Sequence, residues 1–193
     1  MKKFLFLLLL SVVCGQLSVA QTRIRDIYAA TPDSIFPLLT KNNRLDQIDF
    51  RENNMKAEVK NKFDDHSELL VLNDKYLKLQ LSKRCIVEMR LLTDSTFCMV
   101  QTYSAPAPDS RIRLFDTNWN ELPITVETPS VDEFLSEDLD TDTRQSLQAL
   151  SLIKARLDEK DNSITFELQT SELTREQRQK VEGKVHEISR SLP

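Results

Sequence analysis

The residues best suited to acid–base chemistry are three consecutive polar residues, Asp64, Asp65 and His66. A carboxylate beside an imidazole can exchange protons near neutral pH, so this triplet predicts, as one alternative, a hydrolase. Consecutive side chains point in different directions, however, and aspartate is common in turns. We therefore expect a turn between two strands. The hydrolase is favoured only if a further carboxylate converges on the triplet.

A second acidic pattern, Asp138-x-Asp140-x-Asp142, is similar to the start of a calcium-binding loop. Such a loop also needs glycine at its sixth position and glutamate at its twelfth, where this chain has Thr143 and Ala149. The whole chain has only two histidines, which excludes a multi-histidine metal site. We expect neither a metal ion nor another cofactor.

Glycine is almost absent from the chain, which contains only Gly15 and Gly183. A glycine-rich phosphate loop, a dinucleotide fingerprint and a G-x-S-x-G nucleophile elbow all need more glycines than this. The formal net charge is −4, without the basic patch that a nucleic-acid partner requires. These features favour a non-catalytic binding or interaction domain.

A candidate binding surface combines aromatic residues with arginines. Trp119, the only tryptophan, lies in a stretch of turn formers between two alternating segments, and Arg111 and Arg113 alternate on the first of them. With Tyr103 on the preceding strand, these side chains predict a surface for an apolar ligand or a protein of the cell envelope. For Trp119 itself the favoured interpretation is structural: its indole closes the end of the hairpin.

The first twenty residues have the pattern of a secretory signal peptide. Lys2 and Lys3 precede an apolar run over 4–13, and the small residues Ser18-Val19-Ala20 predict cleavage before Gln21. Cys14 offers a lipoprotein alternative, but Val13 stands where a small residue would be expected, so this alternative is the less favoured. We expect an exported protein, periplasmic or secreted, with no transmembrane segment in the mature chain.

The mature chain, residues 21–193, is predicted to form a single α+β domain. Helices are expected near 24–28, 31–36 and 44–53, within 129–150 and from Thr174 to Leu192. From Met55 the apolar pattern changes from a period of 3.6 to a period of 2. Short spacings then predict a largely antiparallel meander over 55–63, 67–72, 77–81, 85–92, 96–103, 111–115 and 122–127, with a last hairpin over 153–157 and 164–168.

We expect the helices to pack on one face of this sheet. Two ways of completing the sheet remain open: a curved, half-open barrel or an open sheet. The capping box of Thr174 and Gln177 begins the closing helix, and an apolar stripe from Val181 to Leu192 is expected to continue it.

Cys85 and Cys98 are expected to be free thiols. If the loop 93–95 joins two antiparallel strands, Cys98 faces Arg90 and Cys85 faces Tyr103. The two sulfur atoms would then lie about 17–20 Å apart along the ladder. A disulfide needs Cα atoms within about 7 Å, so the pair cannot close.

Several stretches together resemble a family of exported Bacteroidales proteins of unknown function. They are Pro32-Asp33-Ser34, the segment 37–46 (PLLTKNNRLD), Ile48-Asp49-Phe50, the segment 54–59 (NMKAEV), Tyr76-Leu77-Lys78-Leu79 and the tryptophan segment. The resemblance spans nearly all of the mature chain, and KNNRLD is its most distinctive part. It implies an exported protein of a Gram-negative envelope and supplies no catalytic residues.

Overall fold

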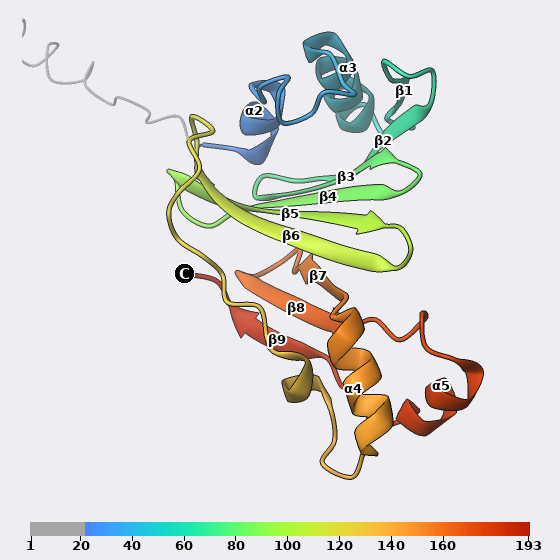
Figure 1. The fold of residues 1–193 in the computed structure, drawn as a ribbon. Helices are drawn as coiled ribbons and strands as arrows, with labels where there is room; N and C mark the ends of the chain where they lie inside the picture. Colours follow the sequence, from blue (N-terminus) through green and yellow to red (C-terminus); the bar gives the residue numbers. More distant parts are fainter. Residues whose placement is uncertain (1–21) are drawn as a thin grey trace, which may run out of the picture.

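The computed structural model describes residues 22–193. The expected signal peptide, the cleavage site before Gln21 and Cys14 lie outside the described residues. Two antiparallel sheets form the frame, with helices on the outer sides of both (Figure 1). The α+β class with an antiparallel meander, predicted from the sequence, is confirmed. Among the described residues, no helix is both long and apolar enough to cross a membrane.

The larger sheet has six strands in the order in which they occur in the chain. Its strands are β1 (Glu58–Lys60), β2 (His66–Leu72), β3 (Tyr76–Ser82), β4 (Cys85–Leu91), β5 (Thr96–Ser104) and β6 (Pro108–Asp116). Polar residues make the turns: the Asn73 side chain accepts hydrogen bonds from the backbone N–H groups of Lys75 and Tyr76. Within the described chain β1 and β6 remain the two edges, so the sheet is open and no closed barrel forms.

Helices α2 (Ile24–Ala29) and α3 (Lys41–Glu52) cover one face of this sheet (Figure 1). Buried apolar residues of the helices, such as Ile27 and Ile48, join the sheet residues in one core. Helix α3 begins three residues before the expected start at residue 44. Thr40 is the N-cap, and Asn43 completes a capping box with it.

The smaller sheet packs against the opposite face of the larger one. It consists of β7 (Ile153–Leu157), β8 (Ser163–Leu168) and β9 (Ile188–Ser191), with the short helix η1 (Val131–Phe134), α4 (Thr141–Leu150) and α5 (Arg175–Val181) around it. A second core joins this unit to residues of the larger sheet such as Cys98 and Val100. The expectation that all helices share one face is therefore corrected. The second sheet occupies the other face, and α4 and α5 are on its side (Figure 1).

Side chains of the larger sheet accept hydrogen bonds from the backbone N–H groups along the open edge of strand β7. The backbone N–H groups of Ile153, Ala155 and Leu157 donate to Asp109 Oδ1 (3.2 Å), Ser110 Oγ (2.8 Å) and Glu88 Oε2 (3.3 Å), respectively. Alternate N–H groups of an edge strand are open to pairing with another chain unless something covers them. Here the covering groups come from strands β4 and β6, which joins the two sheets without a shared ladder.

Buried Arg90 makes the second polar connection between the sheets. Its guanidinium donates to the carbonyl oxygens of Glu159 (2.7 Å) and Lys160 (2.8 Å) and to Asn162 Oδ1 (3.2 Å). These acceptors belong to the turn between β7 and β8. Burial of an arginine is tolerated when its donors are paired in this way.

The expected strand over 122–127 is not formed. Residues 123–130 have no regular structure, and only an isolated bridge between Phe115 and Glu121 continues the ladder. Pro123 cannot donate a ladder hydrogen bond, and Ile124 is exposed. The alternating pattern here belongs to a connection that leads from the larger sheet to η1.

The closing helix is also shorter than predicted. The Thr174–Gln177 capping box is present, but α5 ends at Val181. Gly183 adopts a φ of +73°, a conformation that favours glycine and ends the helix. The rest of the apolar stripe includes Ile188 in β9, which pairs with Phe166 of β8.

Strand register between β4 and β5 is as predicted. Cys85 pairs with Tyr103 and Cys98 with Arg90, and both cysteines are free. Cys85 belongs to the core under α2 and α3, whereas Cys98 belongs to the core against the second sheet. The two thiols thus lie on opposite faces of the larger sheet.

Candidate functional site

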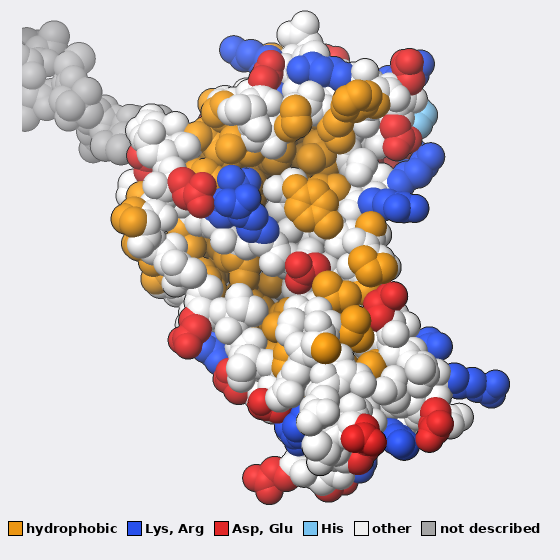
Figure 2. Space-filling view, viewed as in Figure 1, with side chains coloured by type: hydrophobic (Ala, Val, Ile, Leu, Met, Phe, Trp, Pro, Cys, Tyr) orange, Lys and Arg blue, Asp and Glu red, His pale blue; other side chains and the backbone are white. Residues whose placement is uncertain are grey.

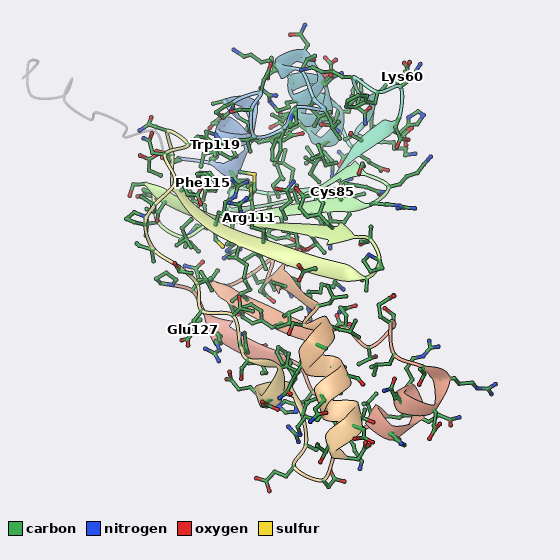
Figure 3. The ribbon with its side chains drawn as sticks, in the orientation of Figure 1. Lys60, Cys85, Arg111, Phe115, Trp119 and Glu127 are labelled. Atoms are coloured by element: carbon green, nitrogen blue, oxygen red, sulfur yellow. The ribbon has the colours of Figure 1, made fainter. Side chains whose placement is uncertain are left out.

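A cleft of about 460 Å³ opens where helices α2 and α3 leave the β6 side of the sheet uncovered. Three of the four predicted binding residues line it: Tyr103, Arg111 and Arg113. Figure 3 shows Arg111 on β6 and Cys85 on the same side of the sheet. The remaining lining residues are Ser34, Ile35, Pro37, Leu38, Leu81, Ser82, Arg84, Cys85 and Gln101.

Strand register places the basic side of the cleft. In the β5–β6 ladder Arg113 pairs with Met99 and Arg111 pairs with Gln101. Alternate residues of a strand share a face, so both arginines project to the side that carries Met99 and the α2–α3 core. Figure 2 shows basic and hydrophobic side chains next to each other above this strand.

The opposite wall comes from a segment far away in the sequence, residues 34–38. The expected short helix here is instead a series of turns between α2 and α3. Buried Arg44 of α3 holds these turns by donating to the carbonyl oxygens of Thr31 (2.6 Å) and Leu39 (3.0 Å) and to Asp33 Oδ1 (3.2 Å). The distinctive stretch KNNRLD therefore has a structural role: its Asn43 completes the capping box of α3, and its Arg44 shapes the wall of the cleft.

The cleft is electropositive. Among the residues that the structure describes, neither Arg84 nor Arg111 has a carboxylate within 4.0 Å. Arg113 lies 5.1 Å from the centre of the Phe115 ring, in cation–π geometry, and 3.6 Å from Glu121. Its Nε is buried without a hydrogen-bond partner in the described structure. The lining contains three arginines and no acidic residue.

Two weak acids in the cleft are held in their neutral forms. Burial raises the pKa of the Tyr103 phenol, with a smaller contribution from nearby Cys85. Burial also raises the pKa of the Cys85 thiol, which accepts a hydrogen bond from Gln101 Nε2 at 3.5 Å. Tyr103 is half exposed and can donate its O–H to a ligand. A thiol that stays protonated is a poor nucleophile.

Trp119, the fourth predicted residue, does not line the cleft. Its side chain is 8% exposed and packs against Phe97, Phe115 and Phe36, at ring-centroid distances of 4.9, 5.4 and 6.1 Å. The indole N–H donates to the carbonyl oxygen of Ile27 in α2 at 3.1 Å. Figure 3 shows Trp119 beside Phe115, at the end of β6 and close to α2.

The triplet Asp64-Asp65-His66 forms the end of the β1–β2 turn and the start of β2. Its side chains separate: Asp64 pairs with Lys60 (2.9 Å), Asp65 with Lys83 (3.5 Å) and His66 Nδ1 with Glu58 (3.3 Å). Asp64 has a φ of +59°, as turn aspartates often do. A hollow of about 250 Å³ lies over Asp65 and His66, but each acidic group there already faces a cation.

The other acidic pattern is also structural. Asp140 caps α4 by accepting from the Thr143 N–H, and Asp138 pairs with Lys184 at 2.7 Å. No cluster of three or more histidine, cysteine or acidic residues suited to a metal ion occurs within residues 22–193.

A larger hollow, about 530 Å³, lies beside α5. Cations such as Arg175 and Arg178 and acids such as Glu167, Glu182 and Glu187 line it together. Mixed charge defines no ligand class, so we take the cleft at β6 as the candidate site.

Sequence reasoning named three of the twelve lining residues and missed the others, among them Arg84 and the wall over residues 34–38. Arg84 follows Ser82 and Lys83 in the β3–β4 turn, where it interrupts the alternation. The available signal was a cation in the tight β3–β4 turn, next to the strand that ends near Tyr103. The proximity of residues 34–38 to β6 had no signal, because it depends on long-range packing.

Comparison with known proteins agrees with this architecture. The chain belongs to a family described as "Protein of unknown function (DUF3256)", whose model matches residues 16–189. No functionally curated protein matches the sequence. A solved structure, described as a domain of an uncharacterized protein from Porphyromonas gingivalis W83, is similar with a TM-score of 0.71 and 21% identity. The match covers 87% of this chain and 92% of that chain, and at this identity it shows the fold alone.

Proposed function

We propose that this protein is an exported, non-catalytic binding protein of the Gram-negative cell envelope, periplasmic or secreted, and that its ligand occupies the cleft at β6. The observation that carries the proposal is the convergence of Tyr103, Arg111 and Arg113 with an apolar wall in one concave site. Pockets that combine an apolar lining with a few polar groups are typical ligand sites. The signal-peptide pattern of residues 1–20 supports export.

The arrangement favours binding over hydrolysis. Nucleophilic catalysis needs a nucleophile beside a base that a third group orients. In the cleft the hydroxyl and thiol groups have no histidine or carboxylate among the lining residues. The residues of the hydrolase alternative, Asp64, Asp65 and His66, are paired with three different partners. Asp65 and His66 border one hollow, but Asp64 does not line it.

Native mass spectrometry tests the binding role. We expect protein isolated from the periplasm of a Gram-negative host to carry a small molecule that is released on denaturation. The variant Tyr103→Ala should lose it, because this half-exposed ring lines the cleft. Phe63→Ala is the matched control, since Phe63 is 77% exposed and lies outside the cleft. Equal ligand loads in both variants would contradict the proposal.

Intact mass tests the export proposal separately. Protein from the native host should begin at Gln21, because Ser18-Val19-Ala20 matches a cleavage site. A chain acylated at Cys14 would instead establish a lipoprotein, and a full-length cytoplasmic chain would refute export.

A further inference from the structure

We infer that the cleft binds a small amphipathic oxyanion, meaning a carboxylate or phosphate group attached to an apolar body. This inference rests on the proposed binding function and deepens it by naming the ligand class. Three observations carry it: unpaired arginines, the absence of acidic residues from the lining, and an aliphatic wall opposite the arginines.

The arginines provide charge that the protein itself does not neutralise. The chain carries a formal net charge of −4, yet the cleft contains Arg84, Arg111 and Arg113 and no acid. Only Arg113 has an ion-pair partner in the described structure, Glu121 at 3.6 Å. A guanidinium group presents parallel N–H donors that match the two oxygens of a carboxylate or phosphate.

Acidic residues near the cleft are engaged elsewhere. Asp33, next to Ser34 of the wall, pairs with Arg44 at 3.2 Å and approaches Lys62 at 4.0 Å. Asp109, which is paired with Tyr103 in the ladder, accepts the N–H of Ile153. Neither carboxylate lines the cleft, so the protein leaves Arg84 and Arg111 free to bind an anionic group of a ligand.

The wall indicates an apolar body on the ligand. Ile35 and Leu38 are half-buried, Leu81 is buried and Pro37 is exposed, and all four line the cleft. Burying a methylene group against such a surface is favourable by about 0.8 kcal/mol. A volume of about 460 Å³ is that of a small-molecule site. A bare inorganic ion would leave this wall uncovered.

Calorimetric titration with four eight-carbon probes tests the inference on the mature protein. Octanoate and octyl phosphate should bind, and octylamine and octanol should bind much more weakly or not at all. Inorganic phosphate, which has the head group alone, should bind more weakly than octyl phosphate. Comparison of the two anions distinguishes a carboxylate ligand from a phosphate ligand. Added salt should weaken binding of both, because it screens the partly exposed arginines.

Arg111→Gln should weaken octanoate binding about tenfold, as expected for loss of one charge-assisted hydrogen-bond pair. Arg111 is exposed and has no side-chain partner in the described structure, so this variant should keep the native stability. Arg156→Gln is the control: Arg156 lies on β7 and pairs with Glu187 outside the cleft. It should leave octanoate binding unchanged.

The outcomes separate the ligand class from the binding function. If octanol or octylamine binds as tightly as octanoate and Tyr103→Ala weakens it, the cleft is a binding site and the oxyanion inference is wrong. If Arg111→Gln and Arg156→Gln have equal effects, the inference also fails. If no probe binds, the oxyanion inference is overturned, and the co-purified ligand measured by native mass spectrometry then decides the binding function alone.

Discussion

Replacing Trp119 with alanine should destabilise the protein by about 4 kcal/mol, within the range for truncating a buried aromatic residue. The side chain is 8% exposed and contacts three phenylalanine rings, so the truncation leaves a cavity between α2 and the end of β6. It also removes the hydrogen bond to the Ile27 carbonyl. The hydroxyl of Thr31 approaches that oxygen only at 3.4 Å and replaces the bond weakly.

Trp119→Phe separates the two contributions. A phenyl ring keeps most of the aromatic contacts and loses the N–H donor, so we expect a loss of about 1–2 kcal/mol. Urea denaturation followed by circular dichroism gives both free energies. Fluorescence of the wild type, whose single tryptophan reports on this site alone, should show the blue-shifted emission of a buried indole. A loss below about 1 kcal/mol for Trp119→Ala, or a water-like emission maximum, would refute the structural role and return Trp119 to the binding surface.

Three further predictions follow from groups outside the indole site. Arg44→Met should cost about 3 kcal/mol, measured by urea denaturation, because it leaves two buried carbonyl oxygens unpaired; an unchanged midpoint would contradict this. Thiol titration of a chain that begins at Gln21, in denaturant without reductant, should find two thiols, and a count of zero would mean that Cys85 and Cys98 are joined. In the native state Cys98 should not react, because burial raises its pKa to about 12. Hydrogen bonds from the Asn120 side chain and from backbone amides lower the pKa of Asp116 below its ordinary 3.8. The contribution of the Asp116 carboxylate to stability is thus complete above pH 3.8 and is lost as the pH falls through the lowered pKa. Acid should therefore shift the fluorescence emission of Trp119, which lies in the same turn. Asp116→Asn should abolish the part of this shift that is due to Asp116.

Local features of the structure were predictable from the sequence. The change of period at Met55 predicted the meander, because alternation over short segments joined by polar turns allows little else. The loop 93–95 set the register that pairs Cys98 with Arg90, since a tight turn fixes the partners of both strands. The Thr174–Gln177 capping box marked the start of α5. All three features depend on residues that are neighbours in the chain, so the sequence could predict them.

Long-range packing decided the rest. The expectation that all helices pack on one face left the other face of the sheet without a cover. The second sheet covers it, and Glu88 and Arg90 become buried connections between the sheets. A period of 2 in the apolar pattern shows which residues share a face of the sheet, but it does not show which element covers that face.

The candidate site illustrates the same division. Alternation placed Arg111 and Arg113 on one side of a strand, and this much the sequence determined by itself. Whether they face solvent, a partner or a cleft depended on the turns at 34–38, which Arg44 anchors from another helix. The turn formers around Trp119 indicated a structural indole, but its hydrogen-bond acceptor, the Ile27 carbonyl, lies 92 residues earlier in the chain and could not be identified from the sequence. Contacts over such separations form only when the whole chain has folded, and they leave no periodic trace in the segments that they join.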